Sequence, residues 1–278
     1  MTDPIFVETG CDVCGSTDSR ELMVLHGSAY HECTRCGLVY AKYMASNLDD
    51  INEHGVTTRL DKYTDKIESK RKTHLKKLGR FDKYRNTGRL LEIGCNAGAL
   101  LAAARDMGWE VSGVDLSSTA SEYARTQQGL DVFTGTVEEA AYPDNYFDVI
   151  YSHAVLEHVR HPLSMLKECK RILRPGGVFY ADTVNWDSYT RKILGADWRL
   201  LYPVSHVHLY TPHNVESLCQ YAGLEHLQTR TTGVRVRANA ENSTFHTPWY
   251  LNLAKGPLSA LTRFTNKGDS IEFTATKR

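Results

Sequence analysis

The sequence predicts an α/β fold, with helices on both faces of a mainly parallel sheet, preceded by a small metal-binding segment. Two observations support this prediction. From residue 89 onward, short apolar runs alternate with helical patterns, and repeated strand–helix units build parallel sheets. Before residue 43, four cysteines occur as two closely spaced pairs. A length of 278 residues accommodates one large domain with a small satellite.

The composition is that of an ordinary globular protein with balanced charge. It has 33 Lys and Arg against 33 Asp and Glu, 41% hydrophobic residues and 24% charged residues. These values exclude a disordered chain, a collagen-like chain and a uniformly basic nucleic-acid binder. No apolar run is long enough to span a membrane, and the first residues lack the basic and apolar regions of a signal peptide. We therefore expect a cytoplasmic protein without a membrane partner.

The two cysteine pairs have the spacing of a zinc site. Two residues separate the cysteines of each pair, and a glycine (Gly15 or Gly37) follows each pair. Two short turns can supply the four thiolates of a tetrahedral Zn²⁺ site, and a glycine allows the positive φ that such a turn needs. We predict a structural zinc ribbon over residues 1–42, with a redox dithiol or an iron–sulfur cluster as alternatives. The predicted ligands are Cys11, Cys14, Cys33 and Cys36.

Residues 43–88 form a polar and then helical stretch, which we assign as a connector or cap. Its apolar positions recur with a spacing near 3.6, and His74 falls among them. Between Arg59 and Arg89, 12 Lys and Arg stand against four Asp and Glu. This excess fits a solvated helix face around an apolar stripe, or a site for an anionic substrate or RNA.

Strand and helix patterns alternate through the rest of the chain. The helices have recognisable ends: Gly108 stops the first, Pro162 opens the third, and a Thr-Pro start and Gly223 bound the last. The predicted helices cover 97–107, 118–128, 162–172 and 214–222. The predicted strands cover 89–93, 110–115, 131–134, 147–152, 177–184, a stretch near 225–238, and 271–277.

A glycine-containing turn joins the first of these strands to the first helix. Gly94 and Gly98 bracket the turn and let a ligand approach the backbone. The turn is not a P-loop, since no Gly-Lys-Ser/Thr follows, and it lacks the GxGxxG spacing. Asp115 ends the next strand, where a carboxylate can accept both ribose hydroxyls of an adenosine. A ligand here would lie at the carboxyl ends of the strands.

Four segments occur in the order typical of one enzyme family. They are LLEIGCNAGALLAAARDMGWEVSGVDLS, FTGTVEEAAYPDNYFDVIYSHAVLEHV, LKECKRILRPGGVFY and HVHLYTPHNVESLCQYAGLE. Together they resemble the motifs of class I S-adenosylmethionine-dependent methyltransferases, over residues 89–278. The resemblance implies a doubly wound, Rossmann-like sheet of seven strands and S-adenosylmethionine as the cofactor. We therefore assign residues 89–278 as the cofactor-binding domain.

The resemblance also assigns cofactor contacts by position. It implies that the methionine end is contacted by Glu92, Gly94, Cys95 and Gly98. The ribose and adenine would be contacted by Asp115 and Leu116, and the adenine edge by Thr136 and Val137. Ser152 and His153 would lie beneath the sulfonium. The family often has Asp where this chain has Thr136. The segment LRPGG matches a turn before the fifth strand.

Methyl transfer to a hydroxyl group needs a base, and His suits neutral pH. We predict His158, His208 and His206 as candidates, in that order. His153 and Glu157 are four apart, so a shared helix face could make an acid/base or metal site. A metal-using relative that methylates quinone precursors has Glu-x-x-Glu-His here. Ala154 replaces the first Glu, which argues against a second metal.

Residues 186–210, between the fifth strand and the last helix, are rich in aromatic and basic side chains, which either grip an acceptor or seal the core. A zinc ribbon ahead of this domain is similar to architectures of bacterial saccharide and natural-product methylation. That resemblance implies a saccharide, a nucleotide-sugar or a natural-product intermediate as the acceptor, and we expect O-methylation because it is common in this branch of the family. The alternatives are an rRNA base methyltransferase, with RNA as the partner, and a non-catalytic cofactor-binding or scaffold protein.

Overall fold

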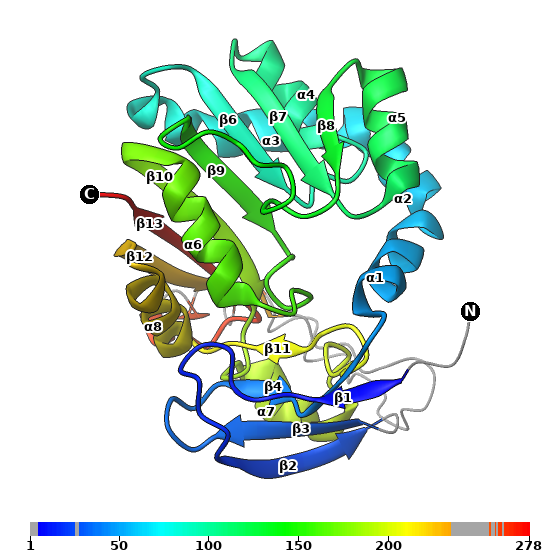
Figure 1. Cartoon of the computed structure of the whole chain (residues 1–278), viewed down its shortest axis with the longest axis vertical. Helices are drawn as coiled ribbons and strands as arrows, with labels where there is room; N and C mark the ends of the chain where they lie inside the picture. The colour runs from blue at the N-terminus through cyan, green and yellow to red at the C-terminus, as the bar shows by residue number, and fades with distance from the viewer. Residues whose placement is uncertain (1–4, 26–27, 235–255, 257–258, 260, 263) are drawn as a thin grey trace.

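A computed structural model describes residues 5–25, 28–234, 256, 259, 261–262 and 264–278 (Figure 1). Its centre is a mixed sheet of seven strands in the order β12-β13-β10-β9-β6-β7-β8. The first five of these strands along the sequence pair in parallel, and β13 runs antiparallel to both of its neighbours. The strands are β6 (Arg89–Ile93), β7 (Glu110–Asp115), β8 (Asp131–Thr134), β9 (Phe147–His153), β10 (Leu173–Val184), β12 (Glu225–Thr232) and β13 (Ser270–Thr276).

The predicted strands agree with this sheet except at two places. LRPGG lies within the strand β10 rather than before it, and the pairing of β10 with β9 shifts register between Leu173 and Val178. A bulge of this kind lets the strand absorb the proline and glycines without ending. The strand predicted near 225–238 ends at Thr232, and residues 235–238 lie outside the described part of the chain.

Helices pack on both faces of this sheet, as predicted. Leu91 and Phe179 face one core that includes Leu166 of α6 and Leu218 of α8. Leu90, one residue away and therefore on the opposite face, packs into a second core with Leu101 of α4. The helices are α4 (Ala99–Asp106), α5 (Ser118–Gln128), α6 (Pro162–Ile172) and α8 (Pro212–Ala222).

A four-stranded sheet lies beyond one end of the central sheet (Figure 1). Its order is β11-β4-β3-β2, with β2 at Ser19–Leu25, β3 at Ser28–Cys33, β4 at Val39–Ala41 and β11 at His208–Leu209. A separate pair joins β1 (Phe6–Glu8) to β5 (Tyr43–Ala45). Because β11 comes from the region after β10, the cysteine-bearing segment shares a sheet with the segment just before α8. A short helix, α7 (Tyr189–Leu194), and the 3₁₀ turn Gly195–Asp197 precede β11.

The segment between the two sheets is helical, with α1 (Leu48–Thr57), α2 (Leu60–Thr64), α3 (Ile67–Leu78) and the 3₁₀ turn Gly79–Tyr84. Several of its basic residues pair with acids of the central domain, such as Arg71 with Asp106 at 2.7 Å. Within the described part of the chain, no helix is both long enough and apolar enough to span a bilayer.

Candidate active site and cysteine cluster

A cavity of about 640 Å³ opens at the carboxyl ends of β6, β7 and β9. Side chains from α1, α2 and α3 form its opposite wall. Its volume lies in the range of small-molecule and cofactor sites. The helical connector therefore completes a binding site with the sheet, and the site lies where open α/β sheets bind their ligands.

The turn between β6 and α4 needs both of its glycines, for different reasons. Gly94 has φ +72°, lines the cavity, and a Cβ there would collide with the side chain of Val155. Gly98 has φ +79°, and a Cβ there would collide with Leu130. Gly98 does not line the cavity, so its role is to allow close packing of the helix start against Leu130.

Glu92 places a carboxyl group with a free oxygen in the cavity wall. The residue is 6% exposed, and its Oε2 has no hydrogen-bond partner in the described part of the chain. Burial, with the nearby Asp115 carboxylate, holds the pKa of Glu92 well above its usual range. A buried carboxyl group of this kind is stabilised by a cation, and the ammonium of a bound amino acid would supply one.

Asp115 is fixed in place by the backbone around it. Its Oδ2 accepts a hydrogen bond from Asn96 N at 2.7 Å, and its Oδ1 accepts one from Ser117 N at 2.9 Å. Burial raises the pKa of Asp115, although these two hydrogen bonds act in the opposite direction. Each oxygen keeps a lone pair, so the carboxylate can accept further hydrogen bonds from a diol.

Most of the residues that the resemblance assigned to the cofactor line this cavity. Glu92, Gly94, Cys95, Asp115, Leu116, Thr136, Val137 and His153 do so, whereas Gly98 and Ser152 do not. Thr136 donates from both its backbone N and its Oγ1 to Glu139 Oε2, at 2.8 and 3.1 Å. Its side chain is therefore already engaged. Ser152 Oγ is buried without a partner among the described residues.

His153 ends β9 and pairs with a carboxylate that sequence reasoning missed. Its Nδ1 lies 2.5 Å from Asp182 Oδ2, and its side chain is 58% exposed and lines the cavity. The other oxygen of Asp182 accepts from Ala154 N at 3.0 Å. Ala154 has φ +53°, an unfavourable conformation for a residue with a Cβ. Asp182 is a β10 residue next to β9, so the pairing of the two strands was the missing information.

The helix face expected for His153 and Glu157 is wrong. Residues 154–160 form bends and a short turn rather than a helix, and Ala154, directly after the strand, has a positive φ. Glu157 instead turns into the protein and accepts from Thr183 Oγ1 at 2.7 Å. It is 3% exposed, and burial raises its pKa.

His158 and His206 form a cluster with Glu157. The ring centroids of the two histidines are 4.7 Å apart, and one potential ligand atom from each of the three residues lies within 4.8 Å of the others. His158 Nδ1 is 3.0 Å from Ser205 O, and His206 Nδ1 is 2.9 Å from Leu200 O. Those contacts place the proton on Nδ1 and leave each Nε2 as an acceptor or potential metal ligand. Burial lowers the pKa of both rings to about 4.

Only one of the three predicted bases lines the cavity among the described residues. His158 does, together with Ser205, but His206 and His208 do not. His208 is completely buried and its Nδ1 lies 3.0 Å from Val159 O. Its position does not suit a group that must touch an acceptor hydroxyl.

The helical connector contributes cavity residues that sequence reasoning left unassigned. His74 of α3 lines the cavity, and neither of its ring nitrogens has a partner among the described residues. Burial, with Lys77, Lys70 and His153 nearby, lowers the pKa of His74 to about 4. Arg59 and Lys70 also line the cavity, and neither has an ion-pair partner or a side-chain hydrogen bond within the described residues. The basic excess of the sequence pointed to this wall without identifying the residues.

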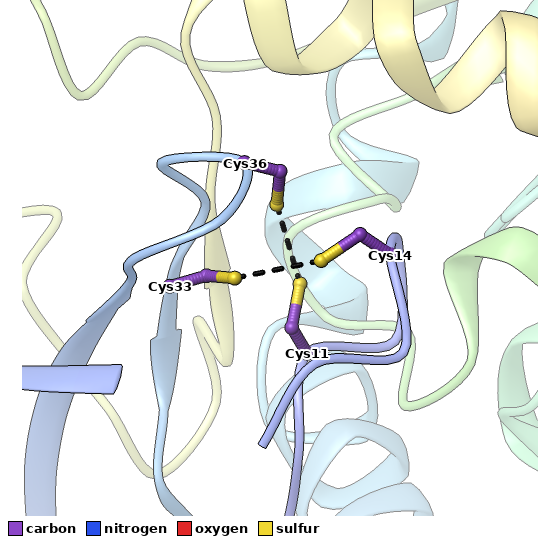
Figure 2. Close-up of side chains that lie close together, drawn as sticks. All are labelled: Cys11, Cys14, Cys33 and Cys36. Carbon is purple, nitrogen blue, oxygen red and sulfur yellow. Dashed lines mark hydrogen bonds between the residues drawn. The ribbon is translucent and has the colours of Figure 1, made fainter. Parts of the chain in front are cut away.

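The four cysteines converge on one point (Figure 2). Cys11 Sγ is 3.4 Å from Cys36 Sγ, and Cys14 Sγ is 3.5 Å from Cys33 Sγ. Sulfurs about 2.3 Å from a tetrahedral Zn²⁺ stand about 3.8 Å apart, so a small adjustment would fit the ion. Gly15 and Gly37 each have φ +71°, as predicted. The cluster is consistent with a zinc ribbon.

Residues 63–229 match a family described as a methyltransferase domain, which is more than half of the chain. The chain belongs to this family. The match begins inside α2 and ends in β12, so it includes α3 and the strands β6 to β10, whereas α1 and β13 lie outside it.

Curated relatives support the same family. The chain is 34% identical over 148 residues to a ubiquinone biosynthesis O-methyltransferase of Cereibacter sphaeroides. This alignment covers 49% of this chain and 60% of the relative. It is also 34% identical over 157 residues to the protein of that name from Aromatoleum aromaticum, covering 51% of this chain and 67% of the relative. The chain thus spans about two thirds or less of these relatives' length.

Solved structures show the same fold at lower identity. A methyltransferase from Thermotoga maritima superposes with a TM-score of 0.55 at 20% identity, covering 83% of this chain and all of that one. A Haemonchus contortus phosphoethanolamine N-methyltransferase in complex with S-adenosyl-L-methionine superposes with a TM-score of 0.53 at 20% identity. The superposition covers 74% of this chain and 52% of that one. Both likenesses concern the fold alone.

Proposed function

We propose that this protein transfers a methyl group from S-adenosylmethionine to a hydroxyl oxygen of a small molecule. The His153–Asp182 pair carries the proposal, because it places a carboxylate-oriented imidazole in the cavity at the end of β9. An oriented imidazole is the arrangement expected of a general base. The names of the curated relatives, which are O-methyltransferases, support oxygen as the methylated atom.

The cofactor fits one end of the cavity. We assign the free oxygen of Glu92 to the ammonium of the methionine part and the carboxylate of Asp115 to the ribose diol. Gly94 and Cys95 would border the methionine part, and Leu116, Thr136 and Val137 the adenine. When bound, the cofactor supplies a methyl carbon on a sulfonium. The protein contributes alignment and the exclusion of water.

His153 would accept the proton of the acceptor hydroxyl. With Nδ1–H directed at Asp182, its Nε2 is the nitrogen available to the acceptor. Methyl transfer to the acceptor oxygen would leave the cofactor as a neutral thioether. The proton moves to Nε2, and Asp182 stabilises the resulting imidazolium. His158, which also lines the cavity, lies with Ser205 on the acceptor side.

The wall contributed by α2 and α3 favours an acidic acceptor. Arg59 and Lys70 line the cavity without a carboxylate partner in the described part of the chain, and S-adenosylmethionine brings only one carboxylate. Among the acceptors that the sequence predicts, a nucleotide-sugar or another acidic saccharide matches this charge best. We also assign Zn²⁺ to the four cysteines as a structural ion, and the cytoplasm as the location.

The test is turnover with a panel of hydroxyl-bearing acceptors. Wild-type protein, S-adenosylmethionine and each nucleotide-sugar or catechol are assayed for S-adenosylhomocysteine and for a methyl ether by mass spectrometry. With an accepted substrate, His153→Gln should lower kcat by about 10²-fold or more, since a general base contributes about that much. His213→Gln, an exposed change on α8, is the matched control. Transfer to nitrogen or carbon, or full activity of His153→Gln, would contradict the proposal.

A further inference from the structure

The cysteine cluster lies beside the acceptor side of the cavity without lining it. Two loops separate the cluster from the cavity: residues 154–161, after β9, and residues 203–207, before β11. The first loop contributes His158 and Arg160 to the cavity wall, and the second contributes Ser205. We call these segments the two acceptor loops. Their contacts with the cysteine-bearing segment are direct and numerous.

The first cysteine turn holds the loop after β9. Asp12 stands between Cys11 and Cys14, and its Oδ1 lies 3.1 Å from His161 Nδ1. Its Oδ2 accepts from Leu163 N at 3.1 Å. Leu163 belongs to the first turn of α6, so Asp12 also satisfies a free N–H at the helix start. The side chain of Asp12 thereby fixes the end of the first acceptor loop.

The second cysteine turn holds the loop before β11. Cys33 and Cys36 form the turn that joins β3 to β4, with Gly37 N donating to Cys33 O at 2.9 Å. β4 pairs with β11, and Ala41 N donates to Val207 O at 2.8 Å (Figure 1). Tyr30 of β3 is completely buried, and its hydroxyl donates to His206 O at 2.7 Å.

A further hydrogen bond connects the second cysteine turn with α8, and others join the loops to each other. Asn214, in the first turn of α8, donates from Nδ2 to Cys36 O at 2.8 Å. Between the loops, His158 Nδ1 contacts Ser205 Oγ at 2.9 Å, and His208 N donates to Glu157 O at 3.2 Å. A displacement of either cysteine turn would therefore reach both loops.

The cofactor side of the cavity lacks such connections. Within the described residues, no hydrogen bond or ion pair joins residues 5–45 to the Gly94 turn or to Asp115. Those groups are held by β6, β7 and the start of α5. The attachments of the cysteine-bearing segment are thus confined to one side of the cavity.

We propose that the four-cysteine centre positions the acceptor loops, with Asp12, Tyr30 and Asn214 as positioning residues, while the cofactor side forms independently of it. This inference rests on the proposed function and on Zn²⁺ as the bound ion. It gives the N-terminal segment a role in the reaction, even though a centre of four thiolates has no open coordination position for a substrate.

Hydrogen exchange on the full-length protein tests the proposal without an acceptor or turnover. Zinc is removed with a chelator, and loss of the metal is verified by elemental analysis. The Leu163 amide, the His208 amide and the Ala41 amide, which donates to Val207 O, should then exchange about tenfold faster or more, because their partners become mobile. Amides of the Gly94 turn should be unchanged, and the Kd for S-adenosylmethionine should stay within about twofold.

Two results would overturn the proposal. One is unchanged exchange at residues 154–163 and 203–208 after zinc has been removed. The other is faster exchange throughout β6 and β7 with loss of cofactor binding, because the centre would then stabilise the whole molecule without selectivity. If the zinc-loaded protein does not bind S-adenosylmethionine at all, the proposed function fails, whereas the exchange pattern still decides the positioning role.

Asp12 offers a test in which the metal stays bound. In Asp12→Ala, one zinc per chain should remain, while the Leu163 amide exchanges faster and the His161 ring resonance shifts. Asp12→Asn keeps an acceptor oxygen and should restore most of both signals. Asp18→Ala removes an exposed carboxylate from the same segment and is the matched control. Equal behaviour of Asp12→Ala and Asp18→Ala, or no rescue by Asp12→Asn, would contradict the assignment.

Discussion

At the scale of single residues, the proposed reaction depends on a pair that no sequence motif contains. His153 was assigned to the cofactor from its position, and the predicted bases lay further along the chain. The structure shows that Asp182 gives His153 an oriented imidazole, whereas His208 is buried away from the cavity. Ala154 and Asp182 are 28 positions apart in the chain, and only the parallel pairing of β9 with β10 brings them together, which explains why the sequence did not show this.

The first prediction concerns the role of Asp182 as a positioning residue. Asp182→Asn should leave the Kd for S-adenosylmethionine unchanged and lower kcat by about 10²-fold, because an amide no longer favours the required tautomer or stabilises the imidazolium. The pH profile of kcat/KM should also move, which a purely structural change would not cause. A variant with the wild-type profile and rate would exclude the pair from catalysis.

The second prediction concerns buried histidine and pH. Burial lowers the pKa of His208 to about 4, whereas an unfolded histidine titrates near 6.5. The unfolded chain therefore binds the proton first as the pH falls, so this contribution to stability is present above pH 6.5 and is lost as the pH approaches 4. Between pH 7 and 5 the loss should be about 2 kcal/mol.

His208→Gln removes this titration. The free energy of unfolding is measured in urea at pH 7 and at pH 5. Its decrease from pH 7 to pH 5, the slope with pH, should be larger for the wild type than for the variant. Comparing the two slopes cancels the opposing contribution of the buried carboxyl groups, whose pKa values are raised. Equal slopes would show that His208 is not held neutral by burial.

At the scale of secondary-structure elements, sequence periodicity predicted the helices and strands whose bounds depend on nearby residues. It missed the pairings between segments that are distant in the chain. The helices 118–128 and 162–172 and the strands 89–93 and 110–115 have the predicted bounds, since caps, glycines and apolar spacing determine them. The two-residue strand β11 was not predicted, because its only reason to be extended is its pairing with β4. The cysteine spacing predicted the cluster. The hydrogen bonds of the cysteine-bearing segment to Leu163 and Val207 could be found only from the folded structure.

The third prediction tests the wall formed by α3. Lys70→Gln should raise the KM for an acidic acceptor by about tenfold, the effect expected of one lost charge-assisted hydrogen bond. The KM for a neutral acceptor should not change. Lys72→Gln, an exposed change on the same helix outside the cavity, is the control. A loss of affinity for S-adenosylhomocysteine in Lys70→Gln would instead assign Lys70 to the carboxylate of the cofactor.

At the scale of the whole molecule, zero net charge conceals an uneven distribution. The basic excess between Arg59 and Arg89 is partly neutralised by acids of the central domain, as in the Arg71–Asp106 and Arg89–Glu110 pairs. Arg59 and Lys70 instead face the cavity. This division favours a small acidic molecule over RNA, which would need a continuous basic surface. The cavity itself is shared between the sheet and the helical connector, so neither segment would form it alone.

If the cavity binds S-adenosylmethionine through Asp115 and Glu92, isothermal titration calorimetry of the full-length protein should detect it. The wild type should bind one S-adenosylmethionine per chain, and Asp115→Ala should weaken binding by about 10²-fold, since two hydrogen bonds to a charged group are lost. Absence of binding to the folded wild type, or equal affinity of Asp115→Ala, would contradict the account.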